Sequence, residues 1–396
     1  MKYFIWRYNP SVVGIRPCSG ITFVVPSSKE KMYLEQNITS LIVADKIDFK
    51  NVYLLLKKQK ERNISIDDIF TLDEDIMDWL GVLKSIFVQG QSGVSDVLFK
   101  DKYYMRSVVN GIISEPNFTE LTTDNYQDIT INEGMIKPRR ADSTKGIQYF
   151  KGSVDINSLK NENGYLSNKD LLVEDFVHYD RMFTVDGYTD FNGHERFFSH
   201  EYNSKLSDFK STGYFTLHTN SCYYNNMLLL RNLFILTKKA LKALSVSRDI
   251  TPFHFEWFYS EKNNKLIFTE AGKRFGGVKL PRLIKNSFNI DILNEYWTLQ
   301  EGKANEIDYS QQTNIPKCCS TSYVQLENGK KMNESFKNRF PNLFTYNQNI
   351  PLRKKSKKAS SIEDTFFLAQ YSTKTPRQSD EIAENINKQF LKECIK

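Results

Sequence analysis

The sequence has few cysteines and histidines, and none of them stands at a spacing that usually binds zinc or forms a redox pair. Its five cysteines include no CxxC, and its five histidines include no HExxH. An odd number of cysteines without paired spacing is typical of reduced thiols, so we expect a cytoplasmic protein.

Long apolar runs are also missing. No stretch approaches the roughly 18 consecutive apolar residues that indicate a membrane-spanning helix. Arg7, Asn9 and Pro10 interrupt the first residues, where a signal peptide would need its apolar core. We therefore expect neither secretion nor a membrane partner.

Two nucleotide-binding fingerprints, GxxxxGK[ST] and GxGxxG, are absent, which excludes a P-loop and a dinucleotide-binding turn. The composition, with 40% hydrophobic and 26% charged residues, is that of a globular protein long enough for two or three domains. The net charge of +7 is modest, and lysines alternate with acids along most of the chain. We interpret the basic run at 353–358 as an exposed loop and predict no nucleic-acid partner.

A pair of glutamates, Glu256 and Glu270, lies on either side of a Lys-Asn-Asn turn and is the most informative feature. Aromatic and β-branched residues dominate both flanks, and asparagine tolerates the positive φ of a tight turn, so the segment predicts a β-hairpin. With a three-residue loop that ends at a left-handed Asn264, Phe258 pairs with Phe268 and Glu256 with Glu270.

Carboxylates that face each other across two strands suggest a metal. Directly opposed side chains stand about 4.5 to 5.5 Å apart at Cβ, and like charges there are destabilising unless something positive lies between them. Magnesium commonly combines one or two carboxylates with water and phosphate oxygens. We therefore predict a site for one or two magnesium or manganese ions that hold a nucleotide phosphate. The alternative is a solvated hairpin whose acids only aid solubility.

The segment that follows the hairpin, EAGKRFGGVKLPRLIKNSFNID, extends this pattern. Arg274 adds a cation, and Gly276 and Gly277 add two unobstructed backbone amides, groups that suit a transferring phosphoryl or an acyl phosphate. The wording resembles the second metal-binding strand of the ATP-grasp superfamily of carboxylate-amine ligases. A structural salt bridge from Arg274 to Glu256 or Glu270 is the alternative interpretation.

Further landmarks of that superfamily stand upstream in the expected order, in FKDKYYMRSVVNGIISEPNF, MIKPR, DSTKG, LLVEDFV and FTVDG. The resemblance implies two lysines on nucleotide phosphates, a loop that closes over them, and a hinge whose backbone holds adenine. The implied nucleotide ligands are Lys102, Lys137, Ser143, Lys145, Gly146, Glu174, Asp175, Phe176 and Val177.

Three positions depart from the superfamily pattern. Gly272 stands where most members carry an asparagine as a further metal ligand, which we interpret as a trait of a subgroup. Met182 replaces an acid before the second-lobe strand, with Asp180 two residues earlier. The phosphate loop has only one glycine, Gly146. His254 shares the strand face of Glu256 by parity, and we interpret it as a packed or hydrogen-bonded histidine.

Residues 1–95 alternate strand-like and helix-like segments, which predicts a parallel sheet with covering helices. The resemblance implies an α/β protein with the ATP-grasp fold, in which this α/β domain precedes two nucleotide-clamping lobes. The small lobe with the phosphate loop would span 96–178, and the large lobe with the metal-binding hairpin and its C-terminal completion 179–396. We expect substrate choice to reside in the N-terminal domain and in the loops 190–214 and 222–226. Dimers are common in the superfamily, so a homodimer is expected.

The resemblance also implies a reaction. ATP transfers its γ-phosphoryl group to a small carboxylate such as an amino acid, and an amine attacks the acyl phosphate to form an amide, with release of ADP and phosphate. Glu256 and Glu270 would hold the metal. Arg274 and the amides of Gly276 and Gly277 would stabilise the oxyanion. Alternatives are another carboxylate activation of the superfamily, with bicarbonate or a thiol or carrier acceptor, and a non-catalytic nucleotide-binding protein.

Overall fold

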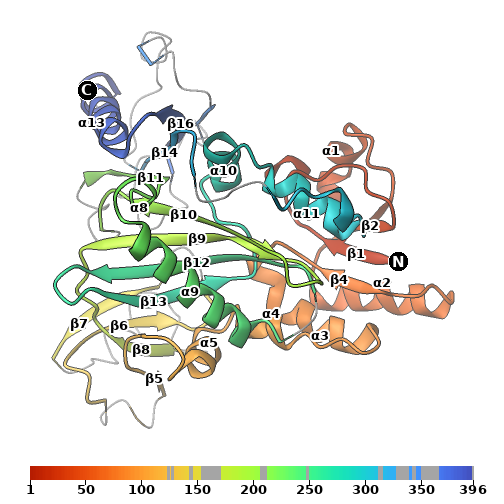
Figure 1. The fold of residues 1–396 in the computed structure, drawn as a ribbon. Helices are drawn as coiled ribbons and strands as arrows, with labels where there is room; N and C mark the ends of the chain where they lie inside the picture. Colours follow the sequence, from red (N-terminus) through yellow and green to blue (C-terminus); the bar gives the residue numbers. More distant parts are fainter. Residues whose placement is uncertain are drawn as a thin grey trace.

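The computed structural model describes residues 1–122, 125, 129–141, 146–152, 171–205, 212–246, 249–310, 315–326, 339–340, 345–348 and 365–394. These residues form three β-sheets with covering helices, an α/β architecture (Figure 1). Within the described part of the chain, no helix is long and apolar enough to cross a membrane.

A four-stranded parallel sheet lies in the N-terminal part of the chain, as the alternating pattern predicted. Its central strands are buried runs of aromatic and β-branched residues, since helices lie against the sheet. The strand order is β3-β2-β1-β4. The elements are β1 (Lys2–Ile5), β2 (Ile21–Pro26), α1 (Glu30–Leu34), β3 (Leu41–Ala44), α2 (Phe49–Glu61), β4 (Asp68–Phe70) and α3 (Met77–Phe87).

A helix from much later in the chain packs against this parallel sheet. Trp297 of α11 (Ile292–Gln300) is fully buried, with its ring centroid 5.0 Å from that of Phe4 and 5.9 Å from that of Phe23. Figure 1 shows α11 beside β1 and β2. The division predicted from the sequence assigned α11 to the large lobe, whereas its apolar side belongs to the core of the N-terminal sheet.

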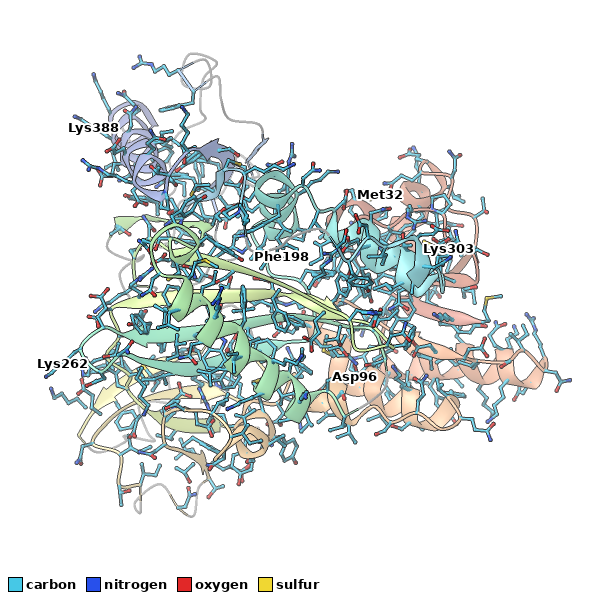
Figure 2. The ribbon with its side chains drawn as sticks, in the orientation of Figure 1. Met32, Asp96, Phe198, Lys262, Lys303 and Lys388 are labelled. Atoms are coloured by element: carbon cyan, nitrogen blue, oxygen red, sulfur yellow. The ribbon has the colours of Figure 1, made fainter. Side chains whose placement is uncertain are left out.

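Buried charges also join the N-terminal domain to the hairpin region. Lys84 of α3 lies 3.0 Å from Asp68 and 3.1 Å from Asp249, and Lys273 lies 2.7 Å from Asp249 and 2.8 Å from Asp96, which Figure 2 labels. Each cation meets two carboxylates, so the charges are paired although they are buried. This network fixes the end of the hairpin relative to the first domain.

A four-stranded antiparallel sheet, in the order β5-β8-β6-β7, forms the small lobe. Two short helices precede it, and the side chain of Asp101 caps the second of them by accepting from the amides of Tyr103 and Tyr104. The elements are α4 (Val94–Leu98), α5 (Lys102–Val109), β5 (Phe118–Leu121), β6 (Glu133–Pro138), β7 (Gln148–Lys151) and β8 (Leu171–Asp175).

The large sheet has eight strands in the order β13-β12-β9-β10-β11-β14-β16-β15, and all its pairings are antiparallel. Its strands are β9 (Arg181–Thr189), β10 (Glu195–Tyr202), β11 (Tyr214–Thr219), β12 (Thr251–Ser260), β13 (Lys265–Gly272), β14 (Cys319–Gln325), β15 (Thr345–Gln348) and β16 (Phe367–Thr373). Its helices are α8 (Cys222–Asn225), α9 (Met227–Leu244), α10 (Leu280–Phe288) and α13 (Pro376–Cys394).

The register of these strands defines two faces of the large sheet. Opposed residues in one row share a face, and the next row faces the other way. One row, which we call the glutamate face, runs through Glu256, Thr184, His200 and Thr219. The neighbouring row, which we call the helix face, runs through Trp257, Phe183, Glu201, His218 and Thr321. Figure 1 shows α9 lying across this sheet.

Contacts identify the helices on each face. The ring of Phe197, in the same orientation as Glu201, lies 5.6 Å from Phe234 of α9, so α9 covers the helix face. Thr321 on that face shares a hydrogen bond of 2.7 Å with Ser379 of α13. On the glutamate face, Thr219 meets Ser287 of α10 at 2.8 Å. The part of the glutamate face near Glu256 is therefore left for the loop that follows the hairpin.

Candidate active site

Glu256 and Glu270 are direct partners across β12 and β13, as the hairpin pattern predicted. Their carboxylates lie on the same side of the hairpin, with side-chain exposures of 14% and 30%. The turn itself projects at the outer edge of the molecule, where Figure 2 labels Lys262. The two acids therefore lie on one sheet face and are partly open to solvent.

The register between the turn and the glutamates differs from the prediction. The turn has four residues rather than three, closed by a hydrogen bond of 3.2 Å from the Asn264 amide to the Glu261 carbonyl, so Ser260 pairs with Lys265. Asn264 is left-handed as expected, with φ 46°. Phe268 consequently pairs with Trp257, and not with Phe258.

A β-bulge restores the glutamate pair. The register shifts between Glu256 and Trp257, so Thr269 is an extra residue on β13 and Glu270 comes opposite Glu256. A bulge re-aims side chains and is common next to active sites. The pairing of the two acids was therefore predicted correctly through two errors that cancel.

Cations of the chain surround the two acids. Nζ of Lys102 lies 3.5 Å from Oε2 of Glu270, and Nε2 of His254 lies 3.5 Å from Oε1 of Glu256. The carboxylates of Glu270 and Glu256 also help to raise the pKa of Arg274, against the effect of its burial. These positive groups explain how the fold tolerates opposed carboxylates.

His254 is held by a buried aspartate on the central strand β9. Its Nδ1 lies 2.8 Å from Oδ1 of Asp186, which is fully buried. Burial lowers the pKa of His254, but Asp186 and the bond to Glu256 raise it to about 10, so the ring is an imidazolium. The histidine is hydrogen-bonded, as interpreted from the sequence, and it links Asp186 to a predicted metal ligand.

The amides of Gly276 and Gly277 differ in availability. The Gly276 amide donates to Oδ1 of Asp186 at 3.0 Å, which corrects the expectation that it is unobstructed and leaves no free donor for an oxyanion. A Cβ at Gly276 would lie 2.6 Å from that oxygen, whereas a Cβ at Gly277 would meet nothing within 4 Å. Gly277 therefore remains the candidate donor, and Gly276 is a close-packing position.

Arg274 pairs with a residue of the N-terminal domain that the sequence did not indicate. Its Nε lies 2.5 Å from Oε2 of Glu74, so the predicted alternative, a salt bridge to Glu256 or Glu270, is wrong. Burial raises the pKa of Glu74, but Arg274, Lys100 and Lys102 lower it to about 2. Glu74 follows β4 directly, and carboxyl ends of parallel strands are common ligand sites, which is the signal that could have revealed it.

The two predicted phosphate lysines lie in different surroundings. Lys102 is the first residue of α5, and its Nζ donates to the Ala141 carbonyl at 2.5 Å besides approaching Glu270. Lys137 on β6 forms a buried ion pair with Oε1 of Glu174. Both lysines are mostly buried yet reach the space between the small lobe and the hairpin.

Glu174 was predicted among the nucleotide ligands, but its carboxylate is occupied by two cations of the protein. Lys137 pairs with Oε1, and Arg106 lies 2.7 Å from Oε2. Burial raises the pKa of Glu174, but Arg106 and Lys137 lower it below its ordinary value. Arg106, which the sequence interpretation missed, also donates to the carbonyls of Phe268 and Thr269 at 3.1 and 2.8 Å. Arg106 thus ties the bulge of the hairpin to the hinge strand.

The predicted hinge follows β8. The Asp175 carboxylate accepts from Nδ2 of Asn117 at 2.6 Å, and the Phe176 amide donates to the Glu133 carbonyl at 2.9 Å, so neither group is free for a base edge in this structure. The Val177 amide has no hydrogen-bond partner among the described residues. It is the hinge donor that remains available.

The predicted phosphate loop is described only at its end. Ser143 and Lys145 lie outside the described residues. Gly146 has φ +68°, in the left-handed region, and a Cβ there would lie 2.9 Å from Cγ of Pro138. The single glycine of this loop therefore stands where a turn requires one.

The donor set bears on the predicted metal. In the part of the chain that the structure describes, no group of three or more His, Cys, Asp or Glu side chains is placed to hold an ion. Two opposed carboxylates without a third ligand agree with Gly272 at the position of the usual asparagine. Such a pair fits magnesium that takes its remaining ligands from water and phosphate, and does not fit a closed protein cage.

Comparison with solved structures gives full-length matches. An L-amino acid ligase from Bacillus licheniformis superposes with a TM-score of 0.72 at 14% identity, covering 98% of this chain and 96% of that chain. A carboxyaminoimidazole ribonucleotide synthase from Aspergillus clavatus, complexed with ATP, gives 0.69 at 10% identity, with 98% of both chains covered. A phosphoribosylglycinamide synthetase from Anaerococcus prevotii gives 0.64 at 12% identity, with 97% of both chains covered. No protein-family model and no curated protein sequence matches the chain. At these identities the likeness establishes a shared fold.

Proposed function

We propose that this chain, which has the ATP-grasp fold, is an ATP-dependent ligase that joins an amino acid or a similar small carboxylate to an amine through an acyl phosphate. The observation that carries the proposal is the opposed pair Glu256 and Glu270 with Lys102 and Arg274 beside it. Carboxylates for a metal and cations for phosphate at one place are what phosphoryl transfer requires.

The residues fit a magnesium ion. Glu256 and Glu270 would hold it from neighbouring strands, and they are partly open to solvent, so water and phosphate oxygens can complete the coordination. When bound, magnesium would neutralise phosphate charge and orient the triphosphate. His254 leans on Glu256 from the side of Asp186 and so limits where that carboxylate can turn.

The residues of the chain have separate tasks in the proposed reaction. Lys102 and Lys137 would bind phosphate oxygens, with Lys137 oriented by Glu174. An oxygen of the substrate carboxylate attacks the γ-phosphorus, and ADP leaves. The amine nitrogen then attacks the acyl carbon, loses a proton, and phosphate leaves with the bonding electrons. Arg274 and the Gly277 amide would stabilise the oxyanion of that second step.

The fixed position of Arg274 supports its proposed task. Its guanidinium is anchored by Glu74 on one side and lies in the field of Glu256 and Glu270 on the other. A preorganised cation of this kind requires little rearrangement when negative charge develops on the substrate. Glu74 acts through Arg274 and is a positioning residue.

The reaction is tested by incubating the protein with ATP, magnesium and pooled amino acids. We expect ADP, phosphate and a condensation product lighter by one water than its two inputs, detected by mass spectrometry. Glu270→Gln should abolish amino-acid-dependent phosphate release. Formation of AMP would indicate adenylation instead, and turnover retained by Glu270→Gln would remove the proposed metal role.

A further inference from the structure

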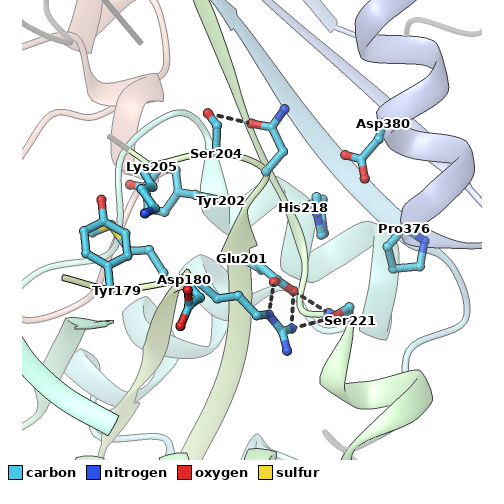
Figure 3. A pocket seen from close by; sticks show the side chains of 13 residues that line it. Tyr179, Asp180, Glu201, Tyr202, Ser204, Lys205, His218, Ser221, Pro376 and Asp380 are labelled. Carbon is cyan, nitrogen blue, oxygen red and sulfur yellow. Dashed lines mark hydrogen bonds and ion pairs between the residues drawn. The ribbon is translucent and has the colours of Figure 1, made fainter. Parts of the chain in front are cut away.

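A polar cavity of about 210 Å³ lies where β9 begins, β10 ends and α13 approaches the large sheet. Figure 3 shows its lining, with the ion pair of Arg181 and Glu201 at the centre and His218 and Asp380 to one side. Ser221, just before α8, completes the polar part. The proposed reaction uses none of these side chains.

The cavity side chains lie on the opposite side of the large sheet from the glutamate pair. Glu201 and His218 oppose each other in the row of the helix face, and Thr321 in that row contacts α13. Glu256 belongs to the next row, which faces the other way. On that other side the rings of Tyr179 and Phe258 stack 3.9 Å apart and close the end of the sheet. A ligand held by Glu201's neighbours in this cavity is therefore separated from Glu256 by the sheet.

Arg181 and Glu201 form a saturated pair that still leaves donor capacity. Nε and Nη2 of Arg181 donate to the two carboxylate oxygens of Glu201 at 2.7 and 2.9 Å, and Nη2 also donates to Ser221 Oγ at 2.6 Å. The Ser221 amide adds a bond of 3.1 Å to Glu201. Nη1 of Arg181 donates to no described residue, so this nitrogen can serve a ligand.

Two further charged groups border the same space. His218 is only 3% exposed, and its Nδ1 meets the Thr219 carbonyl at 2.8 Å. Burial lowers the pKa of His218, but Cys319, Glu201 and that carbonyl raise it to about 9, so the ring carries a positive charge. Asp380 has a buried Oδ1 without any hydrogen-bond partner. A buried acceptor left unsatisfied is costly unless something outside the chain supplies a donor.

We propose that this cavity binds a free α-amino acid at a second, non-catalytic site. Its carboxylate would accept from Arg181 Nη1 and face His218, and its ammonium would donate to Asp380 Oδ1. A molecule with one group of each charge satisfies the cations and the unpartnered oxygen together, which an anion or an amine alone does not. The site goes beyond the proposed ligase reaction, because its ligand lies across the sheet from the reacting groups. Its position between β9 and α13 suits an effector that clamps these elements together.

The test measures binding without turnover. Individual L-amino acids are titrated by calorimetry into the Arg274→Gln variant of the full chain, without ATP or magnesium, so that the proposed reacting site is disabled. We expect at least one amino acid to bind, and saturating ADP with magnesium to leave its affinity unchanged. Adding Asp380→Asn should weaken binding at least roughly tenfold, as one charge-assisted bond is lost.

Glu381→Gln is the matched control, because Glu381 lies on the same helix, is exposed, pairs with Arg377 and does not line the cavity. It should leave the affinity unchanged. Should Asp380→Asn not fold, Ser221→Ala serves in its place, since loss of that hydroxyl frees Arg181 from one of its bonds and alters the affinity. Absence of binding, displacement by ADP, or equal affinity in the Asp380 variant overturns the proposal. Failure of the ligase reaction alone does not touch it, because no step of this experiment needs turnover.

Discussion

The backbone amide of Gly276 donates to Oδ1 of Asp186 across 3.0 Å, and this bond fixes the loop after the hairpin against the centre of the large sheet. The same oxygen accepts from His254 at 2.8 Å, and the other carboxylate oxygen accepts from Thr184 at 3.0 Å. One buried carboxylate thus positions both the loop that follows Arg274 and the histidine beside Glu256.

Gly276→Ala should therefore damage activity more than Gly277→Ala. The new methyl would lie 2.6 Å from Asp186 Oδ1 and 2.8 Å from His254 Nδ1, so the loop must move, whereas the methyl at Gly277 meets nothing within 4 Å. We expect roughly a hundredfold loss of kcat from a displacement near 1 Å and a stability loss of about 1–3 kcal/mol from overpacking. Amino-acid-dependent ADP release and urea unfolding measure the two effects. Equal activities of the two variants would contradict this account of the loop.

Glu74→Gln should lower kcat through Arg274. The variant keeps the shape of the side chain but leaves the guanidinium without its charged partner, so Arg274 can move towards Glu270 or Glu256. Since both partners are mostly buried, we expect a stability loss of about 2–5 kcal/mol. The signature of positioning is a fall in kcat with little change in the KM for ATP, and partial recovery in Glu74→Asp.

Asp75→Asn is the control for this prediction. Asp75 is next in sequence and pairs with Arg7 at 2.8 Å, but its side chain is 43% exposed. Exposed pairs contribute less than about 1 kcal/mol, so this variant should retain activity and most of its stability. A loss of kcat in Asp75→Asn as large as in Glu74→Gln would assign the effect to the domain surface and not to Arg274.

The sequence allowed prediction where a local pattern carries the information. The parallel sheet follows from alternating segments, and the opposed glutamates follow from the hairpin. Even there the details came out differently, because a four-residue turn and a bulge at Thr269 compensate each other, and no local signal distinguishes these from a three-residue turn without a bulge.

Partners from distant parts of the chain could not be predicted. Glu74 and Arg274 are 200 residues apart, and Arg106 and Glu174 are 68 apart. Side-chain pairing over such separations is decided by how domains pack, which no spacing in the sequence encodes. Asp186 gave a weak signal, since an acid within the buried strand Arg181–Thr189 needs a partner. The identity of that partner required the structure.

Asp249→Asn should destabilise the joint between the N-terminal domain and the hairpin. Burial raises the pKa of Asp249, but Lys273 and Lys84 lower it to about 2. Because an unfolded aspartate has a pKa of about 3.9, the stabilising contribution of this carboxylate is present above that pH and is lost as the pH falls towards 2. Breaking such a buried network costs about 3–5 kcal/mol.

The measurement for Asp249→Asn is urea unfolding at neutral and acidic pH. The difference in unfolding free energy between wild type and variant should be largest near pH 7 and should shrink below about pH 4. Asp45→Asn, at an exposed position, should show no such difference at either pH. A difference that stays constant with pH would mean that the network does not depend on the charge of Asp249.

Gly272→Asn should make the protein bind magnesium more tightly. Gly272 lies directly opposite His254 and two residues after Glu270, on the same strand face, where the resembling ligases carry an asparagine ligand. A Cβ there would meet only the Arg274 side chain, at 3.5 Å, so the strand can accept a side chain. A third oxygen ligand for a hard cation should lower the magnesium concentration for half-maximal ADP release several-fold. Gly272→Ala, which adds the Cβ without the amide oxygen, is the matched control, and an equal shift in both variants would show that the added bulk, not coordination, changes the magnesium requirement.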